Sequence, residues 1–270
     1  MASARWADLR LRILSASVLA PLALGCIWIG GAAFAGLIVL IAIGLSYEWL
    51  GLCRRRASPP AALLFAALPL AVLLTARGDM TAAFLLLAAA TVAGAAIGGG
   101  LSPAHPLGFG IPYLGLGAVA LVWLRQPSGV GGVNVIVLLM VVWASDIGAY
   151  IAGRAIGGPR LAPAISPGKT WSGAVGGLAA AALVGAVASA ILRDGAVSWH
   201  PILFAVLIGI ISQAGDLFES QLKRHFGVKD SGSMIPGHGG LLDRLDALLT
   251  AVPAAALLAL TLGRGVVLWK

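Results

Sequence analysis

The chain has 270 residues, of which 60% are apolar and only 10% are charged, and its mean hydropathy is +0.99. Ordinary soluble domains carry about 25% charged residues, so this composition excludes a soluble globular domain and indicates an integral membrane protein. The net charge of +8 is better explained by cytoplasmic anchoring charges and by contacts with anionic lipid or phosphate groups than by nucleic-acid binding, so no nucleic-acid partner is expected.

Long apolar runs recur along the whole chain. A membrane-spanning helix needs roughly 20 mainly apolar residues, whereas the strands of a membrane barrel would alternate in hydropathy over about 10 residues. The runs therefore predict an all-α polytopic membrane protein with about nine transmembrane helices. The predicted spans are Ile13–Ile29, Ala32–Leu50, Ala61–Leu74, Thr81–Ile97, Ile111–Leu124, Val133–Ala152, Gly173–Leu192, Pro201–Phe218 and Ala247–Leu262.

The start of the chain combines several arginines with Trp6, which is typical of a short interfacial helix over residues 1–12. A cleaved signal peptide is the alternative, but a second apolar run begins almost at once, at Ala32, and this favours an uncleaved first span. No second soluble domain is recognisable, so we expect a single transmembrane domain over residues 1–270.

The distribution of Lys and Arg predicts the orientation of the spans. If nine spans alternate, most of the 18 basic residues fall on the side of the N-terminus, and basic loops face the cytoplasm. We therefore expect a cytoplasmic N-terminus, an outside C-terminus and two cytoplasmic polar loops, 153–172 and 219–246. Five tryptophans near predicted span ends suggest an aromatic belt: Trp28, Trp49, Trp123, Trp199 and Trp269.

The stretch from residue 212 to residue 246 is much more polar than the rest of the chain. Five of the ten carboxylates of the chain lie in it: Asp216, Glu219, Asp230, Asp243 and Asp246. Carboxylates close to the membrane interior usually face a protein interior or a wet cavity and have a partner. This density of acids therefore indicates a function other than solubility.

The predicted eighth span carries a polar face. Asp216, Glu219, Lys223 and Arg224 are spaced so that they fall on one side of a helix. A stripe of hydrogen bonds between helices, ending in a solvated tail, explains this spacing equally well.

The start of the last span carries a second acidic pattern. Asp243 and Asp246 share a helix face, close to an N-terminus that favours negative charge. Together with Asp216 they could hold a hard divalent cation, which takes oxygen ligands and phosphate co-ligands. Asp146 and Glu219 are secondary candidates, and helix capping with salt bridges to Arg244 is the structural alternative.

Between these helices lies a run of glycines around one histidine, residues 236–240. Bare backbone N–H groups of such a loop can approach anionic oxygens closely, although a flexible connection is the alternative. Basic residues that suit phosphate are Lys169, Lys223, Arg224 and Lys229. Acids for a metal ion, bases for phosphate and a glycine loop together indicate a nucleotide or polyphosphate site.

Two blocks of the sequence carry a recognisable pattern. The first block is Asp146-x-x-Ala149-Tyr150-x-x-Gly153-Arg154 followed by Ile165-Ser166-Pro167-x-Lys169-Thr170-Trp171, and the second is Ser220-x-x-Lys223-Arg224, Lys229-Asp230, Pro236-Gly237-His238-Gly239-Gly240 and Asp243-Arg244-x-Asp246. Together they resemble the signature of the phosphatidate cytidylyltransferases, also called CDP-diacylglycerol synthases. Many members of the family have an acid or an amide where this chain has Ser172.

The resemblance implies a membrane-bound nucleotidyltransferase of phospholipid biosynthesis. CTP and phosphatidic acid would give CDP-diacylglycerol and pyrophosphate with Mg²⁺ and, as one option, a second cation. The resemblance also implies a homodimer, a place in the inner (plasma) membrane, and an active site facing the cytoplasm.

On this basis each candidate residue receives an expected role. Catalysis is expected from Asp216, Asp243, Asp246, Lys223 and Arg224, and metal binding from the three aspartates with Asp146 and Glu219 as secondary ligands. Substrate binding is expected from Lys169, Ser166, Lys229, His238, Gly239, Gly240, Arg244 and Tyr150.

Three other functions compete with this interpretation. An ion-coupled transporter would suit buried acids, but transporters place binding residues near the midplane on interrupted helices, whereas here the polar residues gather at one membrane face. A structural protein with a lipid-binding loop leaves the carboxylates unexplained. A cytidylyltransferase for a different lipid phosphate would share the site and differ in its lipid groove.

Overall fold

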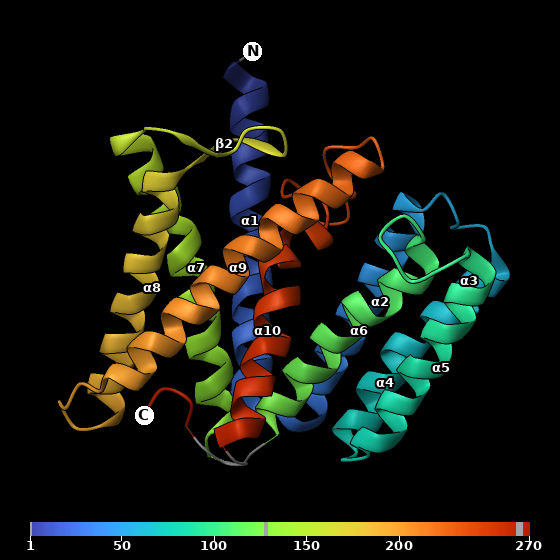
Figure 1. Ribbon diagram of the computed structural model, residues 1–270, viewed down its shortest axis with the longest axis horizontal. Coiled ribbons are helices and arrows are strands. Elements are labelled where there is room, and N and C mark those ends of the chain that lie inside the picture. Colours follow the sequence, from blue (N-terminus) through green and yellow to red (C-terminus); the bar gives the residue numbers. More distant parts are fainter. Residues whose placement is uncertain (1, 127–128, 263–266) are drawn as a thin grey trace. The chain divides into compact units, whose positions relative to one another are not determined.

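A computed structural model describes residues 2–126, 129–262 and 267–270, with side chains described from Leu11 onward. Within these residues nine spans are long and apolar enough to cross a membrane, each matching a predicted one, so the predicted all-α polytopic fold is confirmed. The helices are α1 (Ala2–Ile29), α2 (Gly31–Leu52), α3 (Pro59–Phe65), α4 (Ala67–Ala76), α5 (Met80–Gly98), α6 (Pro106–Arg125), α7 (Gly131–Ile156), α8 (Trp171–Leu192), α9 (Trp199–His225) and α10 (Leu242–Leu262) (Figure 1). Helices α3 and α4 together make the third span, Pro59–Ala76.

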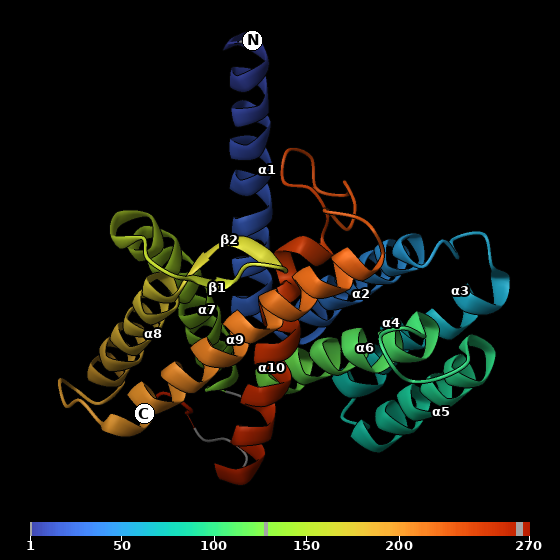
Figure 2. The same ribbon diagram turned by 45° about the horizontal axis from the view of Figure 1, so that its top comes forward.

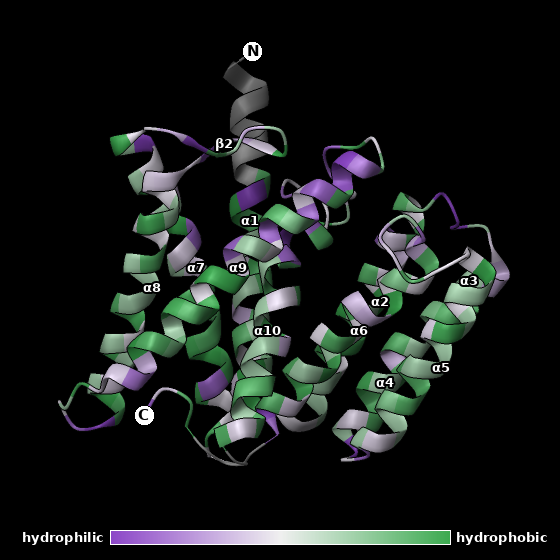
Figure 3. Ribbon diagram, in the orientation of Figure 1, coloured by the Kyte–Doolittle hydropathy of each residue, from purple (hydrophilic) through white to green (hydrophobic). Residues whose placement is uncertain are grey.

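The polar residues lie mostly at the ends of these helices and in the segments that connect them. Figure 3 shows apolar residues along the middle of the helices, whereas the C-terminal end of α9 is strongly hydrophilic. This pattern is the one that a bilayer requires, because charged groups are costly in its hydrocarbon interior.

The chain divides into two compact units. The first unit comprises Met1–Trp123 and His225–Leu245, and the second comprises Leu124–Arg224 and Asp246–Lys270. This division does not test whether residues 1–270 act as one domain, so that expectation stays a prediction. Residues 2–12 of the predicted interfacial segment 1–12 belong to the continuous helix α1, and the side chains of residues 1–10, including Trp6, lie outside the described residues.

The core of the first unit forms where α2 packs against α4 and α4 against α5. Trp49 of α2 is fully buried, with its ring centroid 6.1 Å from that of Phe109 and 5.7 Å from that of Tyr113. Its indole Nε1 donates a hydrogen bond of 2.9 Å to the Pro106 carbonyl. This tryptophan is therefore a core residue that joins α2 to α6, and its predicted place in an aromatic belt is wrong.

The other predicted belt tryptophans divide in the same way. Trp28 and Trp199 are 80% and 63% exposed, as an interfacial position requires. Trp123 and Trp269 are buried, and the Trp269 indole donates to the Asn134 carbonyl at 3.2 Å. Trp269 also packs edge-on against Phe204. Proximity to the end of a span therefore did not decide which tryptophans contact lipid.

The second unit is built on α7 and α8, which lie side by side in both views (Figures 1 and 2). Small residues allow this close approach. A Cβ atom on Gly148 would lie 2.6 Å from Ala180 Cβ, and one on Gly176 would lie 2.2 Å from Ala152 Cβ. Glycine is needed at both positions because a side chain would force the helices apart.

The connection between α7 and α8 contains a hairpin that the sequence did not predict. Strands β1 (Arg160–Ala162) and β2 (Ser166–Thr170) pair antiparallel, with Arg160 opposite Thr170 and Ala162 opposite Ser166. The predicted loop 153–172 is therefore mostly ordered structure, since α7 continues to Ile156 and α8 begins at Trp171.

The second predicted polar loop, 219–246, is also shorter than expected. Helix α9 continues to His225 and α10 begins at Leu242, which leaves 226–241 as the connection. The reason is visible on α9, where Lys223 and Glu219 form an ion pair of 2.7 Å at i, i+4 spacing. Such pairs extend a helix beyond its apolar run.

Candidate active site

The second unit contains a cavity of about 560 Å³ between α7, the β1–β2 hairpin, α8 and α9. Five of the predicted site residues line it: Asp146, Tyr150, Ser166, Lys169 and Asp216. They come from three separate elements, because Asp146 and Tyr150 lie on α7, Ser166 and Lys169 on β2, and Asp216 on α9. The structure thus brings together residues that are up to 70 positions apart in the sequence.

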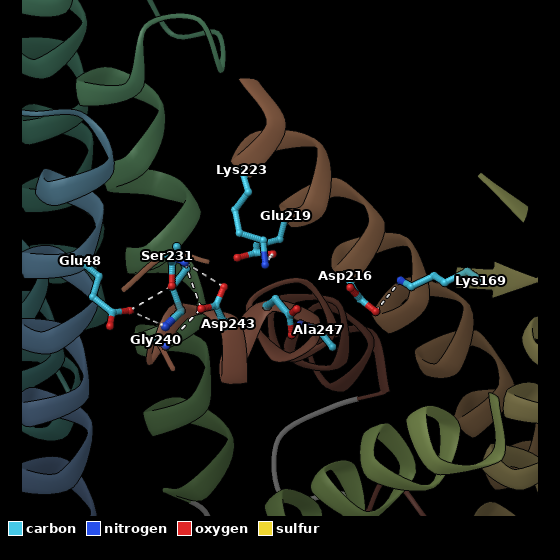
Figure 4. Close-up of polar contacts among 11 residues, drawn as sticks. Glu48, Lys169, Asp216, Glu219, Lys223, Ser231, Gly240, Asp243 and Ala247 are labelled. Atoms are coloured by element: carbon cyan, nitrogen blue, oxygen red, sulfur yellow. Dashed lines mark hydrogen bonds and ion pairs between the residues drawn. The ribbon is translucent and has the colours of Figure 1, made fainter. Parts of the chain in front are cut away.

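An ion pair between Lys169 and Asp216 crosses this cavity (Figure 4). The two side chains are 28% and 32% exposed, so both charges are only partly in contact with solvent. A charge in such a place needs a partner, because its removal from water is costly. Each group therefore neutralises the other in the described chain, although both were predicted to bind ligands.

The hairpin determines the position of Lys169. Its neighbour Thr170 is the N-cap of α8, and the Thr170 Oγ1 accepts a hydrogen bond of 3.1 Å from Gly173 N–H. A Cβ atom on Gly153 would lie 2.9 Å from the Thr170 Oγ1, so α7 passes directly beside this cap. The end of β2 is consequently held against both helices, and Lys169 extends from a rigid base.

Further carboxylates of the second unit surround Asp216. Asp146 on α7 and Asp246 on α10 both interact electrostatically with Asp216. Asp246 also interacts with Glu219 and Lys223 of α9, and its Oδ1 accepts a hydrogen bond of 2.7 Å from Ala247 N–H. Acids from three helices therefore form one negatively charged region, and basic residues lie among them.

In the part of the chain that the structure describes, no group of three or more His, Cys, Asp or Glu side chains is arranged to hold an ion, and the predicted metal site stays a prediction. Mg²⁺, however, is usually bound by only one or two carboxylates together with water and substrate phosphates. The oxygen donors Asp216, Asp246 and Asp146 fit that requirement, since a hard cation prefers carboxylate oxygen.

The first unit contains the glycine–histidine segment, and we call residues 231–243 the signature loop. Both carboxylate oxygens of Asp243 accept from Ser231 N–H, at 3.1 and 3.0 Å, and one of them also accepts from Gly240 N–H at 3.1 Å (Figure 4). Asp243 therefore closes the loop on itself. Asp243 thus holds the loop that precedes α10, since neither donor belongs to the helix, and its role as a metal ligand stays a prediction.

Hydrogen bonds also fix the tip of the signature loop around His238. Arg244 donates from Nε and Nη2 to the His238 carbonyl, at 2.9 and 2.6 Å. Gly237 and Gly239 have φ angles of +76° and +87°, which side chains rarely adopt. The two glycines thus allow the chain to turn back, and an antiparallel bridge pairs Ile235 with Gly239.

The side chain of His238 is fixed by helix α1. Ser15 Oγ lies 2.9 Å from His238 Nδ1, and a Cβ atom on Gly237 would lie 3.0 Å from the Arg12 backbone nitrogen. This contact orients the imidazole and leaves the other ring nitrogen, Nε2, as the one that can meet a substrate. Nothing in the sequence pointed to Ser15, because it lies in a long apolar run.

A second residue that the sequence did not reveal is Glu48 of α2. It is 1% exposed, and its carboxylate accepts from Leu241 N–H at 2.9 Å, from Leu242 N–H at 2.8 Å and from Ser231 Oγ at 3.3 Å. A lone carboxylate inside an apolar span was the available signal, since such groups are rarely without a purpose.

The cavity of the second unit also includes polar residues to which the sequence assigned no role. Arg154 Nη1 donates to the Tyr150 hydroxyl at 3.2 Å, and Arg160 Nη1 donates to the Gly168 carbonyl at 3.4 Å. Gln213 bridges α7 and α8 through hydrogen bonds to Ser145 Oγ and to the Ala174 carbonyl. The remaining predicted residues, Arg224 and Lys229, are exposed.

Comparison with known proteins identifies the family. The sequence profile of the cytidylyltransferase family matches residues 10–262.

The chain belongs to this family.

Curated relatives agree with that assignment along nearly the whole length of the chain. The chain is 42% identical to the phosphatidate cytidylyltransferase of Brucella suis biovar 1 (strain 1330) over 266 residues, which cover 94% of this chain and 93% of the relative. It is 36% identical to the phosphatidate cytidylyltransferase of Pseudomonas aeruginosa over 272 residues, covering 95% and 99%. The chain is thus a membrane-bound nucleotidyltransferase.

Membership of the cytidylyltransferase family confirms the resemblance drawn from the two sequence blocks. The first block supplies Asp146, Tyr150, Ser166 and Lys169 to the cavity of the second unit. At the position where this chain departs from the pattern, the Ser172 hydroxyl donates to the Gly157 carbonyl. Ser172 therefore closes the base of the hairpin, and the main candidate ligands remain in place.

Proposed function

We propose that this protein transfers CMP from CTP to phosphatidic acid and so produces CDP-diacylglycerol and pyrophosphate. The observation that carries the proposal is the Lys169–Asp216 pair in a cavity that also receives Arg154, Arg160 and Asp146. Such a cavity offers cationic groups for phosphate beside carboxylates for a metal ion. The names of the relatives support phosphatidic acid as the lipid.

The cavity suits a reaction between two polyanions. Arg154 and Arg160 present planar guanidinium groups that match phosphate oxygens, while Lys169 acts as a mobile point charge. Their combined charge reduces the repulsion between CTP and a lipid phosphate, and holding the two reactants together removes much of the entropic barrier.

The ion pair in the cavity would change partners when the substrates bind. Lys169 would leave Asp216 for a phosphate of CTP, and the released carboxylate would become available to a cation. This exchange keeps both charges compensated in the ligand-free and in the bound state, so neither state contains an unpaired buried charge.

Mg²⁺ would be held by Asp216 and Asp246, with Asp146 as a further acid. The ligands expected from the sequence also include Asp243 and Glu219, and a second cation is an option. When bound, Mg²⁺ neutralises phosphate charge and orients the phosphates. Within the described residues, Glu219 forms an ion pair with Lys223 and Asp243 holds the signature loop.

The chemistry needs no strong base from the protein. An oxygen of the phosphatidic acid phosphate attacks the α-phosphorus of CTP, the bond from that phosphorus to the bridging oxygen breaks, and pyrophosphate leaves with the electron pair. The second pKa of a phosphate monoester is about 6, so the attacking oxygen is already ionised at neutral pH. The protein therefore acts by neutralising charge and by aligning the reactants.

The charge pattern and the family support the place that we propose for the reaction. The bias of Lys and Arg favours a site on the cytoplasmic face of the inner membrane of a bacterium, where the acyl chains of the lipid stay in the bilayer. A homodimer stays a prediction that rests on the resemblance alone.

The experiment that tests this function uses the purified protein in detergent with labelled CTP and Mg²⁺. We expect a labelled CDP-lipid with phosphatidic acid, no product without Mg²⁺, and no product from the Asp246→Asn variant. A product with another lipid phosphate and none with phosphatidic acid would reassign the lipid, and the absence of any product with all lipid phosphates would overturn the proposal.

A further inference from the structure

Glu48 is the buried acid that the proposed reaction leaves without a role. It lies in the second span, Gly31–Leu52, on a helix with no other charged residue, and it is 1% exposed. A carboxylate in this position is costly unless hydrogen bonds compensate it. Its partners should therefore explain why it is there.

All three described partners of Glu48 belong to the signature loop or to the start of α10. Oε1 accepts from Leu241 N–H at 2.9 Å, and Oε2 accepts from Leu242 N–H at 2.8 Å and from Ser231 Oγ at 3.3 Å (Figure 4). A Cβ atom on Gly232 would lie 2.6 Å from Oε1. The backbone of the loop is thus packed directly onto this carboxylate.

Glu48 performs for α10 what a local capping residue does for most helices. The first N–H groups of a helix have no partner within it, and a Ser, Thr, Asp or Asn just before the helix usually accepts from them. Gly239, Gly240 and Leu241 precede α10, and none has a side-chain oxygen. The carboxylate from α2 takes this place, and its negative charge is favoured at the N-terminus of a helix.

The same contacts link Glu48 to Asp243. Ser231 donates from its hydroxyl to Glu48 and from its backbone N–H to Asp243, while Gly240 N–H also donates to Asp243. Glu48 and Asp243 therefore hold the two ends of the signature loop through one shared residue. A shift of Glu48 would be passed on to the first turn of α10 and to the glycines of the loop.

We infer that Glu48 is a positioning residue: its carboxylate, carried on α2, fixes the signature loop and the first turn of α10 in the arrangement that nucleotidyl transfer requires. The expected effect of Glu48 on turnover rests on the proposed function. Its expected effect on the loop rests only on the contacts described above. Glu48 itself contacts no substrate in this account.

The test compares Glu48→Gln with Ser46→Ala, a matched control on the same helix. Ser46 is also buried, but its hydroxyl bonds to the Ala42 carbonyl of its own helix. Hydrogen exchange of the amides is measured in detergent on the full chain. We expect exchange in the peptide 231–242 to become at least about tenfold faster in Glu48→Gln, with the hairpin peptide 160–170 unchanged and no change in Ser46→Ala.

Turnover provides the second measurement. Displacement of reacting groups by about 1 Å can cost about 100-fold in rate, so kcat of Glu48→Gln should fall by about 10- to 100-fold. Ser231→Ala, which removes one donor and keeps the buried charge, should show a smaller loss of kcat and faster exchange in the same peptide. This second variant keeps the inference testable if Glu48→Gln does not fold.

Two results would overturn the inference. One is that Glu48→Gln and Ser231→Ala both show the hydrogen exchange and the kcat of the wild-type protein. The other is faster exchange throughout the protein with a kcat that falls only with the folded fraction, because Glu48 would then support stability alone. If the wild-type protein shows no activity, the proposed function fails, and the exchange measurement still decides whether Glu48 holds the loop.

Discussion

Two charged side chains inside this protein, Lys169 and Glu48, find their partners in distant parts of the sequence. Lys169 meets Asp216 across 47 positions, and Glu48 meets Leu242 across 194. A membrane protein cannot leave such groups exposed to hydrocarbon. The position of each charge therefore shows which elements the fold must bring together.

The Lys169–Asp216 pair gives a prediction at the scale of single residues. Lys169→Met and Asp216→Asn should each lower kcat/KM for CTP by about 100-fold or more, because removal of one group that stabilises the transition state typically costs that much. The double variant should stay as inactive as the single ones. Recovery of activity in the double variant, measured with labelled CTP, would show that the two residues form only a structural ion pair.

At the scale of elements, the close packing of α7 and α8 determines the shape of the cavity. Helix α7 carries Asp146 and Tyr150, and α8 begins directly after the hairpin that carries Lys169. Gly148 and Gly176 permit the short distance between these helices. A wider separation would displace both walls of the cavity at once.

This packing predicts opposite effects of one substitution at two glycines. Gly176→Ala places a Cβ atom 2.2 Å from Ala152 Cβ and should destabilise the protein by about 1–3 kcal/mol, as overpacking does. Gly36→Ala is the control, because nothing lies within 4 Å of a Cβ atom there. Thermal unfolding in detergent should show a lower Tm for Gly176→Ala and an unchanged or higher Tm for Gly36→Ala. Equal Tm values would contradict the described helix contact.

The elements also show where sequence patterns are sufficient. Long apolar runs located every span, since hydropathy over about 20 residues is a property of the local sequence. The hairpin Arg160–Thr170 was missed because its strands are short and polar, and its register depends on α7 and α8. The ends of α9 and α10 were misplaced because an ion pair and a distant carboxylate, and not hydropathy, extend or begin these helices.

At the scale of the whole molecule, if all nine spans within the described chain cross the membrane, the start of the first span and the end of the last span lie on opposite sides of it. The positive charges predict which side is which. In a variant without Cys26 and Cys53, a single cysteine at Ala57 should be labelled by an impermeant maleimide only after lysis of the cells, and one at Val197 should be labelled in intact cells.

The reverse labelling pattern would invert the orientation, and labelling of both sites in intact cells would contradict the number of spans. Removal of Cys53 prevents background labelling of this native thiol by the maleimide, although such labelling should be slow. Burial raises the pKa of the Cys53 thiol to about 12, so the reactive thiolate is scarce at neutral pH and becomes abundant only as the pH approaches that value.

The sequence by itself determined the fold class, the nine spans and the family, and it predicted most of the candidate site residues, because hydropathy and short motifs are local properties of the chain. It could not determine that Lys169 and Asp216 are partners, that Asp243 closes the signature loop, or that Glu48 caps α10 from another helix. Those facts depend on contacts between residues far apart in the sequence, and only packing in three dimensions decides them. Packing in three dimensions also decides which tryptophans are buried, such as Trp49 and Trp269, and which are exposed.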